Sequence, residues 1–192
     1  TGFLQRLAGA TRRAGALLVF DEIVSFRAGM GGAQALFGLR PDLTCLGKVV
    51  AGGTPGAVFG GRADAMALYD PASGPALIQN GTFNANPIAL TAGRVTLETM
   101  TAAAYDHVAA LAAEAAEGLR GALRSADLPG CVVAIGSLFR LYFLPQPPRD
   151  YRDAAGDDQR LHRFLHLELL RRGIYWRLGG SICLPMARSH AA

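Results

Sequence analysis

The opening residues of the chain have the periodicity of an amphipathic α-helix. Apolar side chains within residues 3–7 fall on one face, and Arg12 and Arg13 follow where a helix C-terminus favours positive charge. Gly15 then supplies a residue type that commonly ends helices. The pattern predicts a helix over residues 3–14.

A continuous apolar run comes directly after this helix. Residues 16–20 read Ala-Leu-Leu-Val-Phe, and the polar residues Asp21 and Glu22 follow at once. A helix, a glycine and a wholly apolar strand are typical of an αβ unit in a parallel sheet that is buried on both faces. Because no strand precedes this unit, we expect further sequence before Thr1.

Glycine-rich loops and short apolar segments alternate through residues 28–61, with the apolar segments at 43–46 and 57–59. Asn86-Pro87 then predicts the start of a helix, because Asn is a favoured N-cap and Pro is favoured at the first helical position.

The second half of the chain predicts a helix–strand–strand–helix–strand order. Apolar positions at helical spacing run from Tyr105 to Leu123, and Pro129-Gly130 ends that helix. Asp157 and Asp158 favour the start of the last helix. We expect strands at 131–135, 138–144, 174–176 and 181–184, a polar loop at 145–156, and the last helix at 157–172.

Composition changes near residue 100, from glycine-rich αβ sequence to this second pattern. We therefore predict two domains, over residues 1–100 and 101–192, joined by helices and without a flexible linker.

Composition and charge exclude several classes of protein. A hydrophobic share of 51% with 18% charged residues is that of a globular chain. No apolar run approaches the roughly 18 residues that span a bilayer. Three scattered cysteines favour neither a disulfide framework nor a zinc site. The net charge of the chain is +4, but the basic residues do not cluster as they do in nucleic-acid-binding proteins. We expect a cytoplasmic protein that binds neither membranes nor nucleic acid.

The use of lysine is unusual. Of 19 basic residues, all but Lys48 are arginine. A single lysine suggests a position where guanidinium cannot replace a nucleophilic amine, and chance survival is the alternative explanation.

Three positions carry candidate chemistry, each with a structural alternative. Asp21 and Glu22 lie where a parallel strand ends, at the edge of a sheet that usually binds ligands, or their carboxylates cap a neighbouring helix or face water. Lys48 follows Gly47 as in a phosphate loop, but Asp42 and Val49 stand where that motif needs Gly and Ser or Thr. The loop 81–87 suits an anion, or it is a plain N-cap.

His162 and His166 have the i, i+4 spacing of metal ligands. The residues between them lack the Glu of a zinc-protease helix, so we expect partly exposed helix histidines and no metal site.

The order of the three candidates suits pyridoxal phosphate. This cofactor needs a lysine for its aldehyde, a carboxylate for its ring nitrogen and an anion site for its phosphate.

Several segments, in this order, resemble the class III aminotransferases, and the similarity is closest to glutamate-1-semialdehyde 2,1-aminomutase and related aminotransferases. The similarity is dense over residues 16–99 and thinner beyond. The segments are Leu17–Arg27, Gly31–Gln34, Pro41–Lys48, Phe59–Arg62 and Gly81–Pro87, with Gly173–Tyr175 and Leu184–Met186 further on.

The resemblance implies an α/β fold, fold type I of the pyridoxal-phosphate transferases. Residues 1–100 would end a large, mostly parallel-sheet domain, and 101–192 would form a small α/β domain. By the same resemblance, Lys48 would hold pyridoxal 5′-phosphate as a Schiff base and Asp21 would pair with its ring nitrogen. Thr82 would bind the cofactor phosphate in the partner subunit of a homodimer that shares its active sites. The substrates would be small amino and carbonyl compounds.

Two departures from the family pattern matter. The chain is about half of the usual length, and Asp21–Arg27 is one residue shorter than the commoner form. A carboxylate expected in the mutases is not evident around residues 179–184, so we favour a transaminase over the aminomutase. A third possibility is an inactive fragment or structural subunit that keeps the fold.

Overall fold

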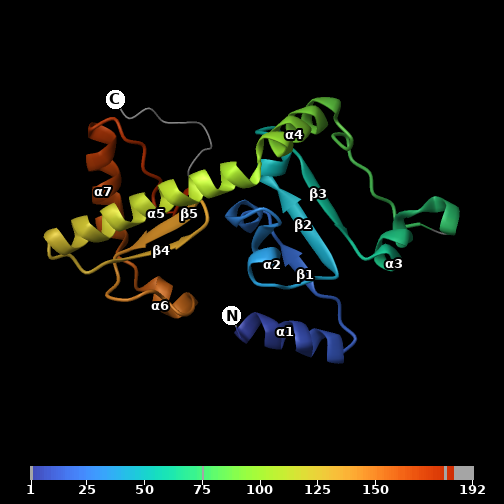
Figure 1. The fold of residues 1–192 in the computed structure, drawn as a ribbon, viewed down its shortest axis with the longest axis horizontal. Coiled ribbons are helices and arrows are strands. Elements are labelled where there is room, and N and C mark those ends of the chain that lie inside the picture. The colour runs from blue at the N-terminus through green and yellow to red at the C-terminus, as the bar shows by residue number, and fades with distance from the viewer. Residues whose placement is uncertain (1, 75, 180, 184–192) are drawn as a thin grey trace. The chain divides into compact units, whose positions relative to one another are not determined.

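The computed structural model describes residues 2–74, 76–179 and 181–183. Residue contacts divide the chain into two compact units, Thr1–Ala102 and Ala103–Ala192, drawn from blue to red along the chain in Figure 1. The assignment of these units to the end of a large domain and to a small domain stays a prediction. Leu184–Met186, quoted above for the family resemblance, lies outside the described residues.

The first unit begins with the predicted helix, α1 (Gly2–Arg13). Gly15 ends it with φ +64°, a left-handed conformation that glycine adopts without strain. The Gly15 and Ala16 N–H groups donate to the Arg12 and Thr11 carbonyls, which satisfies two of the carbonyls left free at the helix end.

Three strands form the sheet of the first unit, in the order β1 (Val19–Asp21), β2 (Leu43–Gly47), β3 (Ala57–Gly61). β1 and β2 are parallel, as predicted, and β3 is antiparallel to β2. In Figure 1 they lie side by side, with β1 at one edge. Val19 is half exposed, so the expected burial of this strand on both faces is not found within the described residues. An edge strand has a partner on one side only, which also explains why β1 is shorter than the apolar run.

Short helices connect these strands. Turns of 3-10 helix lie at Ser25–Ala28 and Lys48–Ala51, and α2 (Gly32–Leu36) precedes β2. The segment after β3 contains α3 (Ala63–Met66) and two more 3-10 turns, Ala67–Tyr69 and Pro71–Ser73.

Helix α4 (Pro87–Thr99) starts as predicted. The Asn86 side chain accepts hydrogen bonds from the N–H groups of Ile88 and Ala89, and Pro87 occupies the first turn. The helix packs against the turn Lys48–Ala51. A Cβ at Gly93 would overlap the Val50 carbonyl oxygen, so glycine is what lets these two backbones approach.

The second unit is built on the long helix α5 (Ala102–Ser125) and an antiparallel sheet of β4 (Cys131–Ile135), β5 (Leu138–Tyr142) and β6 (Ser181–Cys183). Its buried core combines one face of α5 with side chains of the sheet and a tryptophan that precedes β6; it comprises Ala112, Ala116, Leu123, Val132, Phe139, Leu141, Phe143 and Trp176. Apart from an added short helix, α6 (Tyr151–Ala155), the order of elements is the predicted one.

Several expectations about the bounds of elements fail in this unit. The polar loop 145–156 contains a short helix, α6 (Tyr151–Ala155), because the Asp150 side chain caps its first N–H groups. Residues 174–176 do not form a strand. The last helix, α7 (Gln159–Arg171), begins two residues later than expected, with Asp158 as its N-cap.

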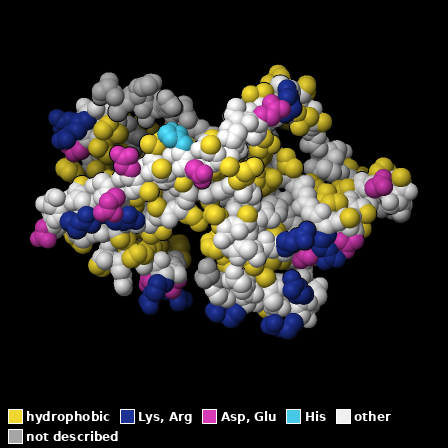
Figure 2. Space-filling view, in the orientation of Figure 1, with side chains coloured by type: hydrophobic (Ala, Val, Ile, Leu, Met, Phe, Trp, Pro, Cys, Tyr) yellow, Lys and Arg dark blue, Asp and Glu magenta, His cyan; other side chains and the backbone are white. Residues whose placement is uncertain are grey.

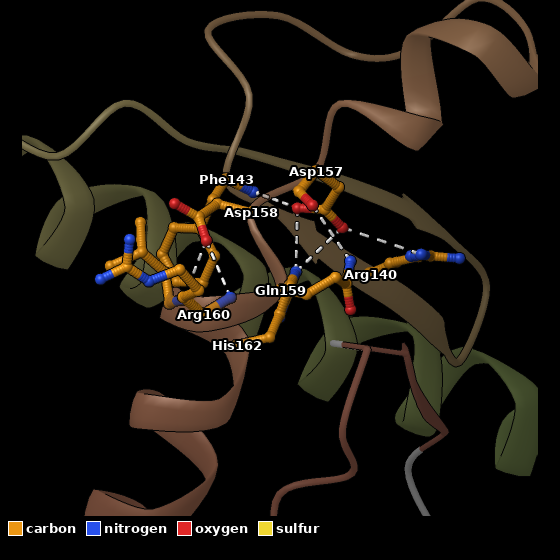
Figure 3. Close-up of polar contacts among 8 residues, drawn as sticks. Arg140, Phe143, Asp157, Asp158, Gln159, Arg160 and His162 are labelled. Atoms are coloured by element: carbon orange, nitrogen blue, oxygen red, sulfur yellow. Dashed lines mark hydrogen bonds and ion pairs between the residues drawn. The ribbon is translucent and has the colours of Figure 1, made fainter.

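Asp157 and His162 are the main surprise, and Figure 3 shows them facing each other. Asp157 is buried and accepts a hydrogen bond from the Phe143 N–H at 2.8 Å. The His162 Nε2 lies 2.9 Å from both carboxylate oxygens. His162 is only 1% exposed, so the expectation of an exposed histidine is wrong at this position.

No metal-binding group of three or more acidic, histidine or cysteine side chains occurs among the described residues, and none of their helices could span a membrane. Figure 2 shows hydrophobic side chains at the surface over α4. They include Ile88 and Leu90, which are 72% and 59% exposed.

Candidate active site

Asp21 is the last residue of β1, at the carboxyl end of the strand. Its carboxylate is exposed, and its Oδ1 accepts a hydrogen bond from the Ile23 N–H at 3.0 Å. The other oxygen has no partner in the part of the chain that the structure describes. Asp21 can therefore present a fixed negative charge to a ligand.

Glu22, the next residue, lies in a different environment. Its side chain is 1% exposed and accepts hydrogen bonds from the Ser25 hydroxyl at 2.5 Å and from the Ala33 and Gln34 N–H groups at 2.9 and 2.7 Å. The structural alternative that we raised for the strand-end carboxylates, capping of a neighbouring helix, is what Glu22 does.

Lys48 follows the last residue of β2 and opens a 3-10 turn. Its φ is +52°, an uncommon and strained value for a residue other than glycine. The side chain is exposed and forms no ion pair within the described residues. A strained backbone that is held by its surroundings is a frequent feature of functional positions.

Asp21 and Lys48 lie at the same edge of the sheet. β1 and β2 are parallel neighbours, and Asp21 is paired with Cys45, three residues before Lys48. Strand geometry thus places the two Cα atoms roughly 10 Å apart. An exposed amine and a carboxylate at this separation fit a small ligand that has an electrophilic carbon at one end and a basic nitrogen at the other.

Thr82 is not brought to this pair by a contact that the structure records. It lies in the exposed loop before α4, and its hydroxyl makes no hydrogen bond to the described residues. Its neighbours Phe83 and Asn84 line a groove of about 780 Å³ together with Cys45 at the middle of β2. The loop therefore shares a groove with β2, while the role of Thr82 stays a prediction.

A cluster of paired charges lies at the opposite end of the strands. The Leu18 N–H and the Arg62 guanidinium hold the pKa of Asp42 below its ordinary value. This cluster joins the beginnings of β1 and β2 to the end of β3, and its charges are satisfied by one another. It is a structural link and not a candidate catalytic group.

Sequence reasoning missed the residues that support the candidate pair. The Glu22 contacts depend on Gly32, which has φ +73° and where a Cβ would stand 2.7 Å from the carboxylate. Gly93 has the same permissive role for the Lys48 turn. The signal was the glycine itself, at positions where a helical residue would otherwise be expected.

Comparison with known proteins places the chain among enzymes of one kind. The family model of the class-III aminotransferases matches residues 1–181. The glutamate-1-semialdehyde 2,1-aminomutase of Sorangium cellulosum is 46% identical over 176 residues, which are 91% of this chain and 40% of that protein.

Solved structures give the same result. An omega-transaminase from Sphaerobacter thermophilus is 38% identical with a TM-score of 0.91, over 96% of this chain and 43% of that one. A transaminase with PLP bound is 32% identical with a TM-score of 0.88, over 99% of this chain and 44% of that one. The chain therefore spans less than half of the length of these relatives. The predicted fold type is confirmed by the neighbours.

Proposed function

This chain belongs to the class-III aminotransferase family, and we propose that it serves pyridoxal-phosphate-dependent transfer of an amino group between an amine or amino acid and a carbonyl compound. The observation that carries the proposal is the pair formed by Lys48 and Asp21 at one sheet edge. Lys48 is the sole lysine of the sequence and has a strained backbone. A relative with PLP bound supports the choice of cofactor.

Lys48 is the residue proposed to hold the cofactor. When bound, pyridoxal phosphate supplies an electrophilic aldehyde and a ring that accepts the electrons of a broken bond at the substrate carbon. Lys48 would hold the aldehyde carbon through its Nζ, with release of one water. When the substrate amine takes its place, the freed Nζ would be able to accept the proton of the substrate carbon and to deliver a proton to the aldehyde carbon of the cofactor.

Asp21 is proposed to keep the ring nitrogen protonated. The Ile23 N–H fixes one carboxylate oxygen, which leaves the other available. A fixed negative charge beside that nitrogen would keep the proton on it, so that the positively charged ring can accept the electrons of the broken bond, and such preorganised charges commonly give the largest catalytic effect.

Thr82 is proposed to bind the cofactor phosphate of a second subunit. Its exposed hydroxyl precedes the N-terminus of α4, and such positions suit anions. Sharing of sites between subunits requires a homodimer. Exposed apolar side chains on α4 support an additional partner surface.

The aminomutase reaction is a second candidate, favoured by the 46% identity to an aminomutase. Lys48 and Asp21 would do the same work, and nitrogen would return to an adjacent carbon of one substrate. Incubation with an amino-carbonyl substrate and no other carbonyl compound separates the two, because a transaminase then stops after about one conversion per active site, whereas a mutase returns the nitrogen within one substrate and continues. A cytoplasmic location stays a prediction.

Borohydride trapping tests the proposal. The polypeptide that carries this chain is incubated with pyridoxal phosphate, reduced and digested, and the adduct is located by mass spectrometry. We expect it on Lys48, and no adduct in Lys48→Ala. Trapping that is unchanged in Lys48→Ala would refute the assignment, and an absence of any adduct in the parent chain would favour the inactive fragment.

A further inference from the structure

Glu22 is a buried charged residue to which the proposed reaction gives no role. We propose that Glu22 is a positioning residue, which acts through Asp21 by locking the turn that fixes the Asp21 carboxylate. This inference rests on the proposed function only for its last step, the effect on the cofactor. The locking of the turn is a property of the chain itself.

The turn after β1 is tied at both of its ends. The Glu22 N–H donates to the Cys45 carbonyl at 2.9 Å, which continues the ladder between β1 and β2. The Phe26 N–H donates to the Glu22 carbonyl at 3.0 Å. Between these bonds lies the Ile23 N–H, the group that fixes Asp21 Oδ1. The direction of that N–H therefore depends on the conformation of residues 22–26.

The Glu22 side chain holds this turn against a segment more than ten residues away. It binds the Ser25 hydroxyl inside the turn and the Ala33 and Gln34 N–H groups at the start of α2. A buried carboxylate with three donors has no other favourable position, because breaking these bonds would leave its charge without partners in an apolar setting. The side chain therefore acts as a clamp between the turn and α2.

The close approach of Gly32 shows how tightly the clamp is built. A Cβ at this position would lie 2.7 Å from Glu22 Oε1 and 2.9 Å from Oε2, and its φ of +73° also disfavours any other residue. Only glycine at position 32 therefore leaves room for the Glu22 carboxylate. Such close packing fixes the turn, and a fixed turn would keep the Asp21 carboxylate in one orientation.

Three single variants, the double variant Glu22→Gln with Asp21→Asn, and a control test the proposal. Glu22→Gln keeps the shape but presents an NH₂ group to donors, so at least one bond is lost. Glu22→Asp keeps the charge and shortens the side chain by one methylene. It replaces Glu22→Gln in the measurements if that variant does not fold. Asp21→Asn removes the charge on which Glu22 is proposed to act. Glu98→Gln is the control, because Glu98 is an exposed glutamate that pairs only with Arg94 in its own helix.

The first measurement is amide hydrogen exchange without cofactor. Loss of one buried bond should speed exchange of Ile23, Ala33 and Gln34 roughly ten-fold in Glu22→Gln, while Glu98→Gln stays at the parent rate. Unchanged exchange in both Glu22 variants would overturn the clamp, whether or not the protein proves to be a transaminase.

The second measurement asks whether Glu22 acts through Asp21. In Glu22→Gln we expect kcat to fall about ten-fold with little change in KM, and the dissociation constant of pyridoxal phosphate to rise. The pH dependence of the visible absorption of bound cofactor should shift, as it does in Asp21→Asn. In the double variant, kcat should equal that of Asp21→Asn alone. A further loss in the double variant, or an unchanged absorption profile, would make Glu22 a structural residue only.

If the parent chain binds no cofactor, the proposed function fails and the exchange experiment still decides the clamp. The two failures are thereby distinguished.

Discussion

The buried pair of Asp157 and His162 gives the sharpest test of how the second unit is held together. Figure 3 shows the carboxylate between the end of β5 and the start of α7. The carboxylate accepts a hydrogen bond from the Phe143 N–H and lies within hydrogen-bond distance of the His162 Nε2. It also forms an ion pair with the Arg140 guanidinium at 3.8 Å. Asp157→Ala would remove all three interactions at once.

The loss of stability caused by Asp157→Ala can be estimated from the burial of the groups that Asp157 contacts. Phe143 and His162 are 9% and 1% exposed, so water cannot replace the lost acceptor. The second ring nitrogen of His162 already lacks a partner among the described residues. Each buried donor that is left without an acceptor costs about 1–3 kcal/mol, and both the Phe143 N–H and the His162 ring lose their acceptor, so the loss is about 2–6 kcal/mol. Exchange of amides in α7 should then speed up by at least about 30-fold, since each 1.4 kcal/mol is a factor of ten.

Asp158→Ala is the matched control. It removes the neighbouring carboxylate, which is exposed and caps the N–H groups of Arg160 and Leu161. Loss of an N-cap costs about 1 kcal/mol, or about a five-fold change in exchange. Adding His162→Leu to Asp157→Ala should cost nothing further, because it removes the unpartnered imidazole. Equal effects of Asp157→Ala and Asp158→Ala would refute the reasoning.

Three more outcomes follow from other contacts. Gly93→Ala should destabilise the protein by about 1–3 kcal/mol in urea unfolding, because its Cβ would meet the Val50 carbonyl, whereas Gly118→Ala in open space should stabilise it by about 0.5–1 kcal/mol. The pKa of Asp42 is lowered by the Leu18 N–H and then by Arg62, so this carboxylate stabilises the fold above its unfolded pKa of about 3.9 and the contribution is lost as pH falls further. Between pH 4 and pH 2 the parent should lose more stability in acid-unfolding curves than Asp42→Asn, and parallel curves would contradict this. Mixing Lys48→Ala with Thr82→Ala should restore some transaminase activity if the two residues serve different sites, and no recovery in proven heterodimers would refute the shared site.

Elements with local signals were predicted well from the sequence. Both the Gly15 end of α1 and the Asn86-Pro87 start of α4 depend on residues within one helical turn, and both were found in place. Elements that depend on distant partners were not. Residues 174–176 are apolar enough for a strand but pair with no strand among the described residues, and a strand without a ladder does not form.

The burial of His162 shows the same limit. Spacing along α7 cannot reveal that the chain turns just before Asp158 and returns the Asp157 carboxylate towards the helix. An acidic residue next to a helix start predicts an N-cap. Of Asp157 and Asp158, only Asp158 caps α7. Which of the two is buried is decided by the position of β5, whose end supplies the Phe143 N–H.

The doublet Asp21-Glu22 raises the same question at the candidate site, and strand geometry answers it. Adjacent side chains at the end of a strand point to opposite sides, so two neighbouring carboxylates cannot share one environment. One of them must meet α2, and Glu22 does so with both of its oxygens engaged. The other is left exposed, with one oxygen fixed by Ile23 and one free. Helix capping and ligand binding were alternative interpretations only while Asp21 and Glu22 were considered together. Glu22 caps α2, and the exposed Asp21 carboxylate remains available for the proposed contact with a ligand.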